Sequence, residues 1–144
     1  MLDRRPDGVI HLRTAQELGT YHRKLSEPLE HWAKAAPDRV FLAQCDGDGW
    51  RKLTYGQTLG QVRRIAAALL RRGLSADRPI VIMSGNDIEH ALLGVAAMHV
   101  GIPYAPVSPA YSLMSGDFGK LKAIVDLLTP GLVFANSGEV FARA

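Results

Sequence analysis

Cysteine is nearly absent from the sequence, which contains only Cys45 among 144 residues. A single cysteine can neither form a disulfide within the chain nor build a cysteine-based metal site. Aromatic residues are also few, at 7%, but hydrophobic residues make up 47% of the chain. Because that apolar fraction is enough for the core of one domain, the sequence predicts a globular fold without a disulfide, suited to a reducing compartment.

Long hydrophobic runs are missing as well. The longest, Ala91–Met98, is less than half of the roughly 20 residues that a membrane-spanning helix needs. The opening segment, Met1–Asp7, is not followed by the apolar stretch of a secretory signal. We therefore expect a cytoplasmic protein with no membrane partner.

Charge of one sign is not concentrated anywhere in the chain. Seventeen Lys and Arg residues oppose fourteen Asp and Glu residues, which leaves a formal net charge of +3. The basic residues are spread along the sequence and form no basic arm, so we expect no nucleic-acid partner.

The chain divides into an N-terminal arm, residues 1–25, and a folded part, residues 26–144. The arm mixes charge, glycine and histidine with little periodicity, apart from Val9–Leu12, which is typical of an edge strand lying on another surface. Ser26 is expected to cap a short helix with its hydroxyl, and Pro37 is expected to end that helix.

A β-hairpin and a long helix are predicted next. Val40–Cys45 and Trp50–Leu53 are strand-like runs joined by an Asp-Gly-Asp-Gly turn. Thr54 and Gln57 have the spacing of a capping box, which opens an amphipathic helix that a glycine, Gly73, ends.

From Pro79 the pattern becomes regular and predicts a βαβαβ unit. The expected strands are 80–83, 104–107 and 132–135, and the expected helices are 88–100 and 117–128. Helical crossovers imply parallel strands and right-handed connections. We expect Asn86 to cap helix 88–100, whose apolar residues on all sides predict burial from both sides. The sequence leaves open whether the bonds before Pro103, Pro106 and Pro109 are cis or trans.

The last residues are typical of a helix start, with Asn136 and Ser137 as caps, but the chain stops at Ala144. A βαβ series that ends there lacks the partner that would bury the new helix. We therefore expect the front piece of a longer protein, whose uncovered apolar face can drive dimer formation.

Motifs that carry chemistry are few. The turn Asp46–Gly49 has the acidic spacing of a calcium loop, but Trp50 and Gln57 occupy the fifth and twelfth positions, so a hairpin turn is favoured. His99, near a helix C-terminus, is interpreted as a packed residue. Because the chain has no nucleophile with a base, no paired carboxylates and no lysine-bearing phosphate loop, we assign no catalytic residue and no metal ligand.

Polar side chains follow two of the predicted parallel strands, where ligands bind in open parallel sheets. The candidate ligand contacts at this edge are Ser84, Asn86, Ser108 and Tyr111. The turn from residue 84 to residue 86 leads into a helix N-terminus, which suits an anion, but its single glycine is weaker than a glycine-rich fingerprint.

The order of these features resembles a known family. The segments that carry the resemblance are Leu53–Tyr55, Arg71–Leu74, Pro79–Asn86 and Gly101–Val107. Together they resemble the opening segment of adenylate-forming enzymes, the acyl- and aryl-CoA synthetases. The run Ser108–Ser112, with Asp117–Leu121 after it, is most similar to feruloyl-CoA synthases.

This resemblance implies that residues 26–144 form a partial N-terminal subdomain of an AMP-binding ligase. The parent enzyme would use ATP and Mg²⁺ to convert a hydroxycinnamate-type acid to its adenylate, and would then transfer the acyl group to CoA. The family's phosphate loop, its catalytic lysine and its substrate pocket would lie beyond Ala144, so the chain alone is expected to be inactive and to bind none of these cofactors. Where some relatives carry a basic residue that meets CoA phosphate, this chain has Ala110.

The alternative from another functional class is a small flavodoxin-like module that binds a ligand or a partner by itself. A receiver domain is disfavoured because the strand ending in Met83–Gly85 has no acidic pair to hold magnesium. A mononucleotide binder would have to hold phosphate at the Ser84 turn.

Overall fold

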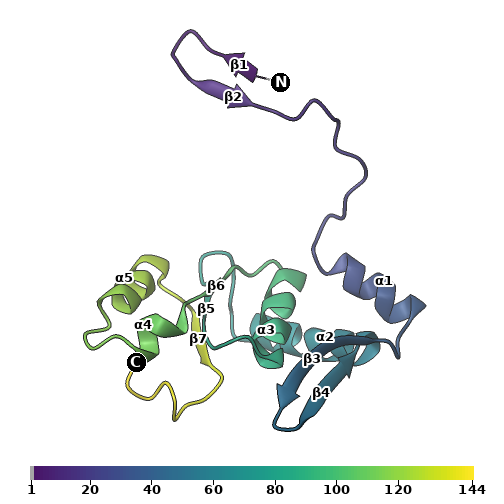
Figure 1. The fold of residues 1–144 in the computed structure, drawn as a ribbon, viewed down its shortest axis with the longest axis vertical. Helices are drawn as coiled ribbons and strands as arrows, with labels where there is room; N and C mark the ends of the chain where they lie inside the picture. The colour runs from purple at the N-terminus through teal and green to yellow at the C-terminus, as the bar shows by residue number, and fades with distance from the viewer. Residues whose placement is uncertain (1) are drawn as a thin grey trace.

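The computed structural model describes residues 2–144, with three separate β-sheets and five helices in that range (Figure 1). In chain order the elements are β1 (Leu2–Arg4), β2 (Ile10–Leu12), α1 (Glu27–Ala35), β3 (Val40–Asp46), β4 (Gly49–Thr54), α2 (Tyr55–Arg71), β5 (Ile80–Met83), α3 (Ile88–His99), β6 (Tyr104–Pro106), α4 (Pro109–Leu113), α5 (Gly119–Leu128) and β7 (Leu132–Ala135). None of the helices in this range has both the length and the hydropathy needed to cross a membrane.

The N-terminal residues form a hairpin of their own. We expected Val9–Leu12 to lie as an edge strand on another surface, but β2 pairs antiparallel with β1 instead. The partner strand is close in sequence, and Gly8 turns the chain with φ of +85°. Figure 1 shows this hairpin standing away from the other elements, at the end of an extended segment that leads into α1.

The central hairpin and the long helix are confirmed. β3 and β4 pair antiparallel around a turn in which Gly47 has φ of +59°. The capping box of α2 is present: Thr54 Oγ1 accepts from the Gln57 amide at 3.2 Å, and Gln57 Oε1 accepts from the Thr54 amide at 3.0 Å. These bonds satisfy two backbone donors at the helix start.

The predicted parallel sheet is confirmed with the strand order β6-β5-β7. Side chains of β5 alternate between two cores, because successive residues of a strand point to opposite faces. Ile80 and Ile82 join the core with α2 and α3, whereas Val81 and Met83 join the core with Leu121 of α5. Figure 1 accordingly shows α4 and α5 on one side of the sheet and α3 and α2 on the other.

Helix α3 is buried, as its apolar composition predicted. Its buried residues are Ile88, Leu92, Leu93, Gly94, Ala96 and Ala97. They share one core with residues of β5 and of α2, so the helix is covered by both. Gly101, with φ of +73°, follows the helix as expected.

Several elements differ from the prediction: α3 ends at His99 rather than residue 100, and β6 ends at Pro106 rather than residue 107. The helix expected from Asp117 begins at Gly119, because Asp117 Oδ1 accepts from the Gly119 amide at 3.0 Å and Phe118 has a left-handed φ of 56°. A short helix that the sequence did not predict, α4, precedes it. After β7 the chain forms turns instead of the expected helix, and Phe141 packs into the smaller core.

Two predicted helix caps are also corrected. Asp87, not Asn86, is the N-cap of α3, since its Oδ1 accepts from the His90 amide at 2.7 Å. Ser26 is the N-cap residue of α1, but its hydroxyl makes no capping bond and contacts His99 instead. The prolines left open by the sequence, Pro103 among them, follow trans bonds, as do all prolines in residues 2–144.

Candidate functional site

The candidate site lies at the carboxyl ends of β5 and β6. These strands are parallel neighbours, with Val81 opposite Ala105, so the turns that follow them leave from the same edge of the sheet. One turn leads into α3 and the other into α4. Because α3 and α4 lie on opposite faces of the sheet, the two turns border two different cavities.

Ser84 and His90 interact at the turn before α3. Ser84 is 4% exposed, and its Oγ donates to the Gly85 carbonyl at 3.1 Å. His90 Nδ1 lies 2.9 Å from that Oγ and 3.1 Å from the same carbonyl. Since a carbonyl only accepts, these contacts favour the tautomer with its proton on Nδ1, which leaves Nε2 of the neutral ring unprotonated.

Asp87 uses both carboxylate oxygens in structural contacts. Oδ1 accepts from the His90 amide, and Oδ2 accepts from Asn136 Nδ2 at 2.7 Å. The carboxylate also lies at the positive end of the α3 dipole. Asp87 therefore fixes the start of α3 and links it to the residue that follows β7.

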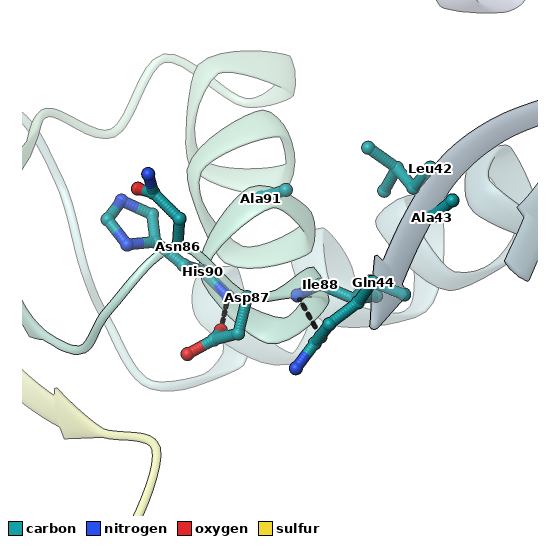
Figure 2. A pocket seen from close by; sticks show the side chains of 8 residues that line it. All are labelled: Leu42, Ala43, Gln44, Asn86, Asp87, Ile88, His90 and Ala91. Atoms are coloured by element: carbon teal, nitrogen blue, oxygen red, sulfur yellow. Dashed lines mark hydrogen bonds between the residues drawn. The ribbon is translucent and has the colours of Figure 1, made fainter. Parts of the chain in front are cut away.

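The first cavity lies between β3 and the start of α3 and has a volume of about 250 Å³. Its lining residues are Leu42, Ala43, Gln44, Asn86, Asp87, Ile88, His90 and Ala91, which Figure 2 shows. Gln44 Oε1 accepts from the Ile88 amide at 2.9 Å, so one of the free helix donors is already occupied. The cavity is slightly smaller than typical ligand pockets, and its lining contains a carboxylate but no Lys or Arg. It is therefore poorly suited to a polyphosphate.

The second cavity lies beside α4 and α5 and has a volume of about 460 Å³. It is lined by Ala110, Tyr111, Met114, Ser115, Asp117, Gly119 and Lys120. The ammonium of Lys120 lies 5.3 Å from the centre of the Tyr111 ring, within the range of a cation–π contact. This cavity thus combines an aromatic face with a cation, a combination that suits a planar anionic ligand.

Asp117 is the one carboxylate that lines the second cavity. Its Oδ1 accepts from the Gly119 amide and from Ser115 Oγ, both at 3.0 Å. These hydrogen bonds, that from Gly119 first, lower the pKa of the Asp117 carboxyl below its ordinary value. The Asp117 carboxylate is therefore occupied by hydrogen bonds at the start of α5. Lys120 is the cation that borders the cavity.

The four residues predicted from the sequence are not brought together. Asn86 lines the first cavity, and Tyr111 lines the second. Ser84 is buried against His90, and Ser108 is exposed at the start of α4. Their assignment as ligand contacts stays a prediction. Sequence reasoning did not single out Gln44, His90 or Lys120, because their roles come from contacts that no local motif announces.

Metal binding was expected at no residue of this chain. In the part of the chain that the structure describes, no three His, Cys, Asp or Glu side chains gather closely enough to hold an ion.

Comparison with protein families identifies the fold's relatives. The family described as AMP-binding enzyme matches residues 29–138, which is most of the chain. The matched segment begins inside α1 and ends just after β7, so it contains both cavities and leaves out the N-terminal hairpin.

Two curated relatives illustrate the sequence similarity. Tyrocidine synthase 2 of Brevibacillus parabrevis is 26% identical over 103 residues, which are 72% of this chain and 3% of the relative. The D-alanine–D-alanyl carrier protein ligase of Bacillus licheniformis is 27% identical over 115 residues, which are 80% of this chain and 21% of the relative. The chain thus spans a small part of the length of these proteins.

Two solved structures show the same fold. The fatty acyl-adenylate ligase of L. pneumophila, in complex with acyl adenylate and pyrophosphate, has a TM-score of 0.71 and 17% identity. The match covers 81% of this chain and 20% of that one. The N-terminal subdomain of Klebsiella oxytoca NpsA, in complex with 3-hydroxyanthranilyl-AMSN, has a TM-score of 0.66 and 18% identity, covering 81% and 28%.

Proposed function

The chain belongs to the AMP-binding enzyme family of adenylate-forming ligases, and on that premise we propose that it is the N-terminal part of an ATP-dependent aryl-CoA ligase. The observation that carries the proposal is the family match across residues 29–138 together with the shared α/β fold. This assignment favours the ligase interpretation over the alternative of a free-standing flavodoxin-like module.

The proposed reaction activates a carboxylic acid in two steps. Adenylation replaces a poor leaving group by AMP, with pyrophosphate as the co-product, and a thiol then displaces AMP from the acyl carbon. Both steps develop negative charge that donors and a metal must stabilise. Since the chain spans only a small part of the length of its curated relatives, the proposed sites for ATP, Mg²⁺ and the catalytic groups lie in a longer polypeptide. The proposed contribution of this chain is a parallel sheet covered by helices.

A hydroxycinnamate-type aromatic acid is the proposed substrate class. This proposal rests on the resemblance of Ser108–Ser112 and Asp117–Leu121 to feruloyl-CoA synthases that the sequence suggested. The NpsA subdomain, which shares the fold, is described in complex with a 3-hydroxyanthranilyl compound, so aromatic acyl groups suit at least one protein of this fold.

CoA is the proposed acyl acceptor. The sequence argued against a contact between CoA phosphate and the residue after Pro109, because Ala110 occupies the position where some relatives carry a basic residue. In the folded chain Lys120 of α5 reaches the same cavity as Ala110 and lies over Tyr111. The Lys120 ammonium therefore supports a contact with CoA phosphate in this cavity, in which α5 supplies the basic residue instead of the position after Pro109.

The second candidate acceptor is a carrier-protein thiol. It is favoured by the curated relatives, one of which is named as a carrier protein ligase. The two acceptors differ in what they require at the surface, since CoA needs a cation for its phosphates and a carrier protein needs a larger docking area.

The test begins by sequencing the coding frame beyond codon 144 and expressing the complete product. ATP–pyrophosphate exchange with ferulate, benzoate and amino acids then identifies the acid, and product analysis with CoA or a carrier protein identifies the acceptor. Ferulate-dependent exchange followed by feruloyl-CoA formation supports the proposal. Exchange with amino acids alone, or acyl transfer only to a carrier protein, contradicts the aryl-CoA assignment.

A further inference from the structure

Ser26 and His99 are in contact although they are 73 positions apart. Ser26 is fully buried, and its Oγ lies 3.0 Å from His99 Nδ1. Ser26 immediately precedes α1, and His99 is the last residue of α3. The contact therefore fixes the point at which the N-terminal arm, residues 2–25, joins the rest of the chain.

Charged groups from α1, α2 and the N-terminal arm surround His99. Glu30 of α1 places Oε1 3.5 Å from His99 Nδ1, and the same oxygen accepts from Lys24 Nζ at 2.9 Å. Lys24 belongs to the arm, and Arg63 of α2 also acts on both His99 and Glu30. One carboxylate thus faces two permanent cations and a titratable imidazole.

The surroundings favour the neutral form of His99. Burial is the largest cause that lowers the pKa of the imidazole below its ordinary value of 6.5, and the charges of Lys24 and Arg63 act in the same direction. Glu30 opposes them. At neutral pH the ring is uncharged, and Nδ1 can accept from the buried Ser26 hydroxyl.

We propose that the Ser26–His99 contact is a pH-sensitive latch that sets how the N-terminal arm leaves α1. When the imidazole is protonated, Nδ1 becomes a donor, and the Ser26 hydroxyl becomes the acceptor of this contact. Its new charge competes with Lys24 for the Glu30 carboxylate. Lys24 then leaves the Glu30 carboxylate, because Lys24 is more exposed than His99 and belongs to a segment without regular secondary structure.

A second contact holds the arm near α1. His22 Nδ1 lies 3.1 Å from Glu27 Oε2, and the Arg23 amide donates to the same oxygen at 3.2 Å. Because these contacts do not involve His99 or Glu30, the arm keeps them when Lys24 leaves Glu30, so the arm pivots without detaching.

The test is an NMR titration of the full chain from about pH 8 to about pH 5, the range in which histidine changes charge. We expect the amide signals of Lys24 and Leu25 to move with the midpoint of the His99 ring protons, below the ordinary histidine value. Amides that stay fixed, or whose midpoint differs from that of the His99 ring, overturn the proposal.

Matched variants separate the latch from general effects of pH. His99→Gln keeps a polar side chain but cannot titrate, so the pH response of Lys24 and Leu25 is lost. His31→Gln, in the same helix as Glu30 but with its ring against Trp32, retains the response. A response that persists in His99→Gln overturns the proposal.

A further variant gives an answer even if His99→Gln does not fold. Lys24→Gln removes one of the charges that lower the pKa of His99, so the midpoint of His99 rises toward its ordinary value. An unchanged midpoint in Lys24→Gln shows that Lys24 and His99 do not act on one another and also overturns the proposal.

Discussion

Asn136 and Asp87 are joined by a hydrogen bond of 2.7 Å between Nδ2 and Oδ2. Asn136 directly follows β7, and Asp87 is the N-cap of α3, which follows β5. The bond therefore ties together the two chain segments that leave the carboxyl ends of neighbouring parallel strands. It also orients the carboxylate whose other oxygen caps the helix.

The first prediction concerns this cap. Asp87→Ala removes the acceptor of the His90 amide and the partner of Asn136, so it should lower the free energy of unfolding by about 1–2 kcal/mol. Asn136→Ala should cost less, because the cap remains. Asn86→Ala is the matched control and should change the thermal midpoint little. Thermal unfolding of the three variants checks this order. A larger loss of stability in Asn86→Ala than in Asp87→Ala would indicate that Asn86 is the N-cap, as the sequence predicted.

The second prediction compares two helical glycines. A Cβ at Gly94 would lie 3.0–3.2 Å from two ring carbons and the hydroxyl oxygen of Tyr104, whereas a Cβ at Gly60 meets nothing within 4 Å. Gly60→Ala should stabilise the protein by about 0.5–1 kcal/mol, through helix propensity alone. Gly94→Ala should destabilise it, because overpacking costs about 1–3 kcal/mol and outweighs that gain. Denaturant unfolding measures both, and equal effects would contradict the close packing at Tyr104.

The third prediction concerns Thr58, which is fully buried in α2. In residues 2–144 its Oγ1 has no hydrogen-bond partner. Thr58→Val keeps the shape and removes the unpaired hydroxyl, so it should stabilise the protein by about 1 kcal/mol. Thr58→Ser is the control, because it keeps the hydroxyl and loses a methyl group, and it should destabilise. A loss of stability in Thr58→Val would show that the hydroxyl is hydrogen-bonded in solution.

The fourth prediction tests the proposed CoA contact. In the complete protein, Lys120→Gln should raise the KM for CoA about tenfold, the effect expected when one charged hydrogen bond to phosphate is lost. The KM for ATP should stay unchanged. Lys34→Gln, at an exposed position of α1, is the matched control. Equal KM values for CoA in wild type and Lys120→Gln would show that Lys120 does not contact CoA.

The fifth prediction concerns pH and the ion pair between Arg51 and Glu89. The hydrogen bond from Arg51 lowers the pKa of the Glu89 carboxyl below its ordinary value of 4.5. The contribution of the Arg51–Glu89 ion pair to the free energy of unfolding is therefore present above about pH 4.5 and is lost as the pH falls further. Both side chains are more than two-fifths exposed, so Glu89→Gln should cost less than about 1 kcal/mol at neutral pH. A cost that persists at low pH would contradict an ionic origin.

Local patterns identified most of the elements, because they depend on residues close in sequence. The capping box of Thr54 and Gln57 joins residues three positions apart, and the alternating cores of β5 follow from strand geometry. The start of α3 at Ile88 was predicted correctly, but its cap was placed one residue too early, since Asn86 and Asp87 are both good caps and only the fold decides which one adopts the extended backbone before the helix. The start of α5 was missed because Phe118 adopts a left-handed φ that its residue type does not announce.

The sequence by itself determined the fold class and the βαβαβ succession of elements, because hydrophobic periodicity and turn residues act over a few positions. The resemblance to adenylate-forming enzymes came separately, from the motifs and their order along the chain. Only the tertiary structure decided which distant groups meet. Gln44 reaches the first amide of α3, Lys120 reaches the ring of Tyr111, and Ser26 turns away from its own helix to His99. Such contacts depend on how helices and sheets pack against one another, and a side chain selects its partner only after that packing has brought the two together.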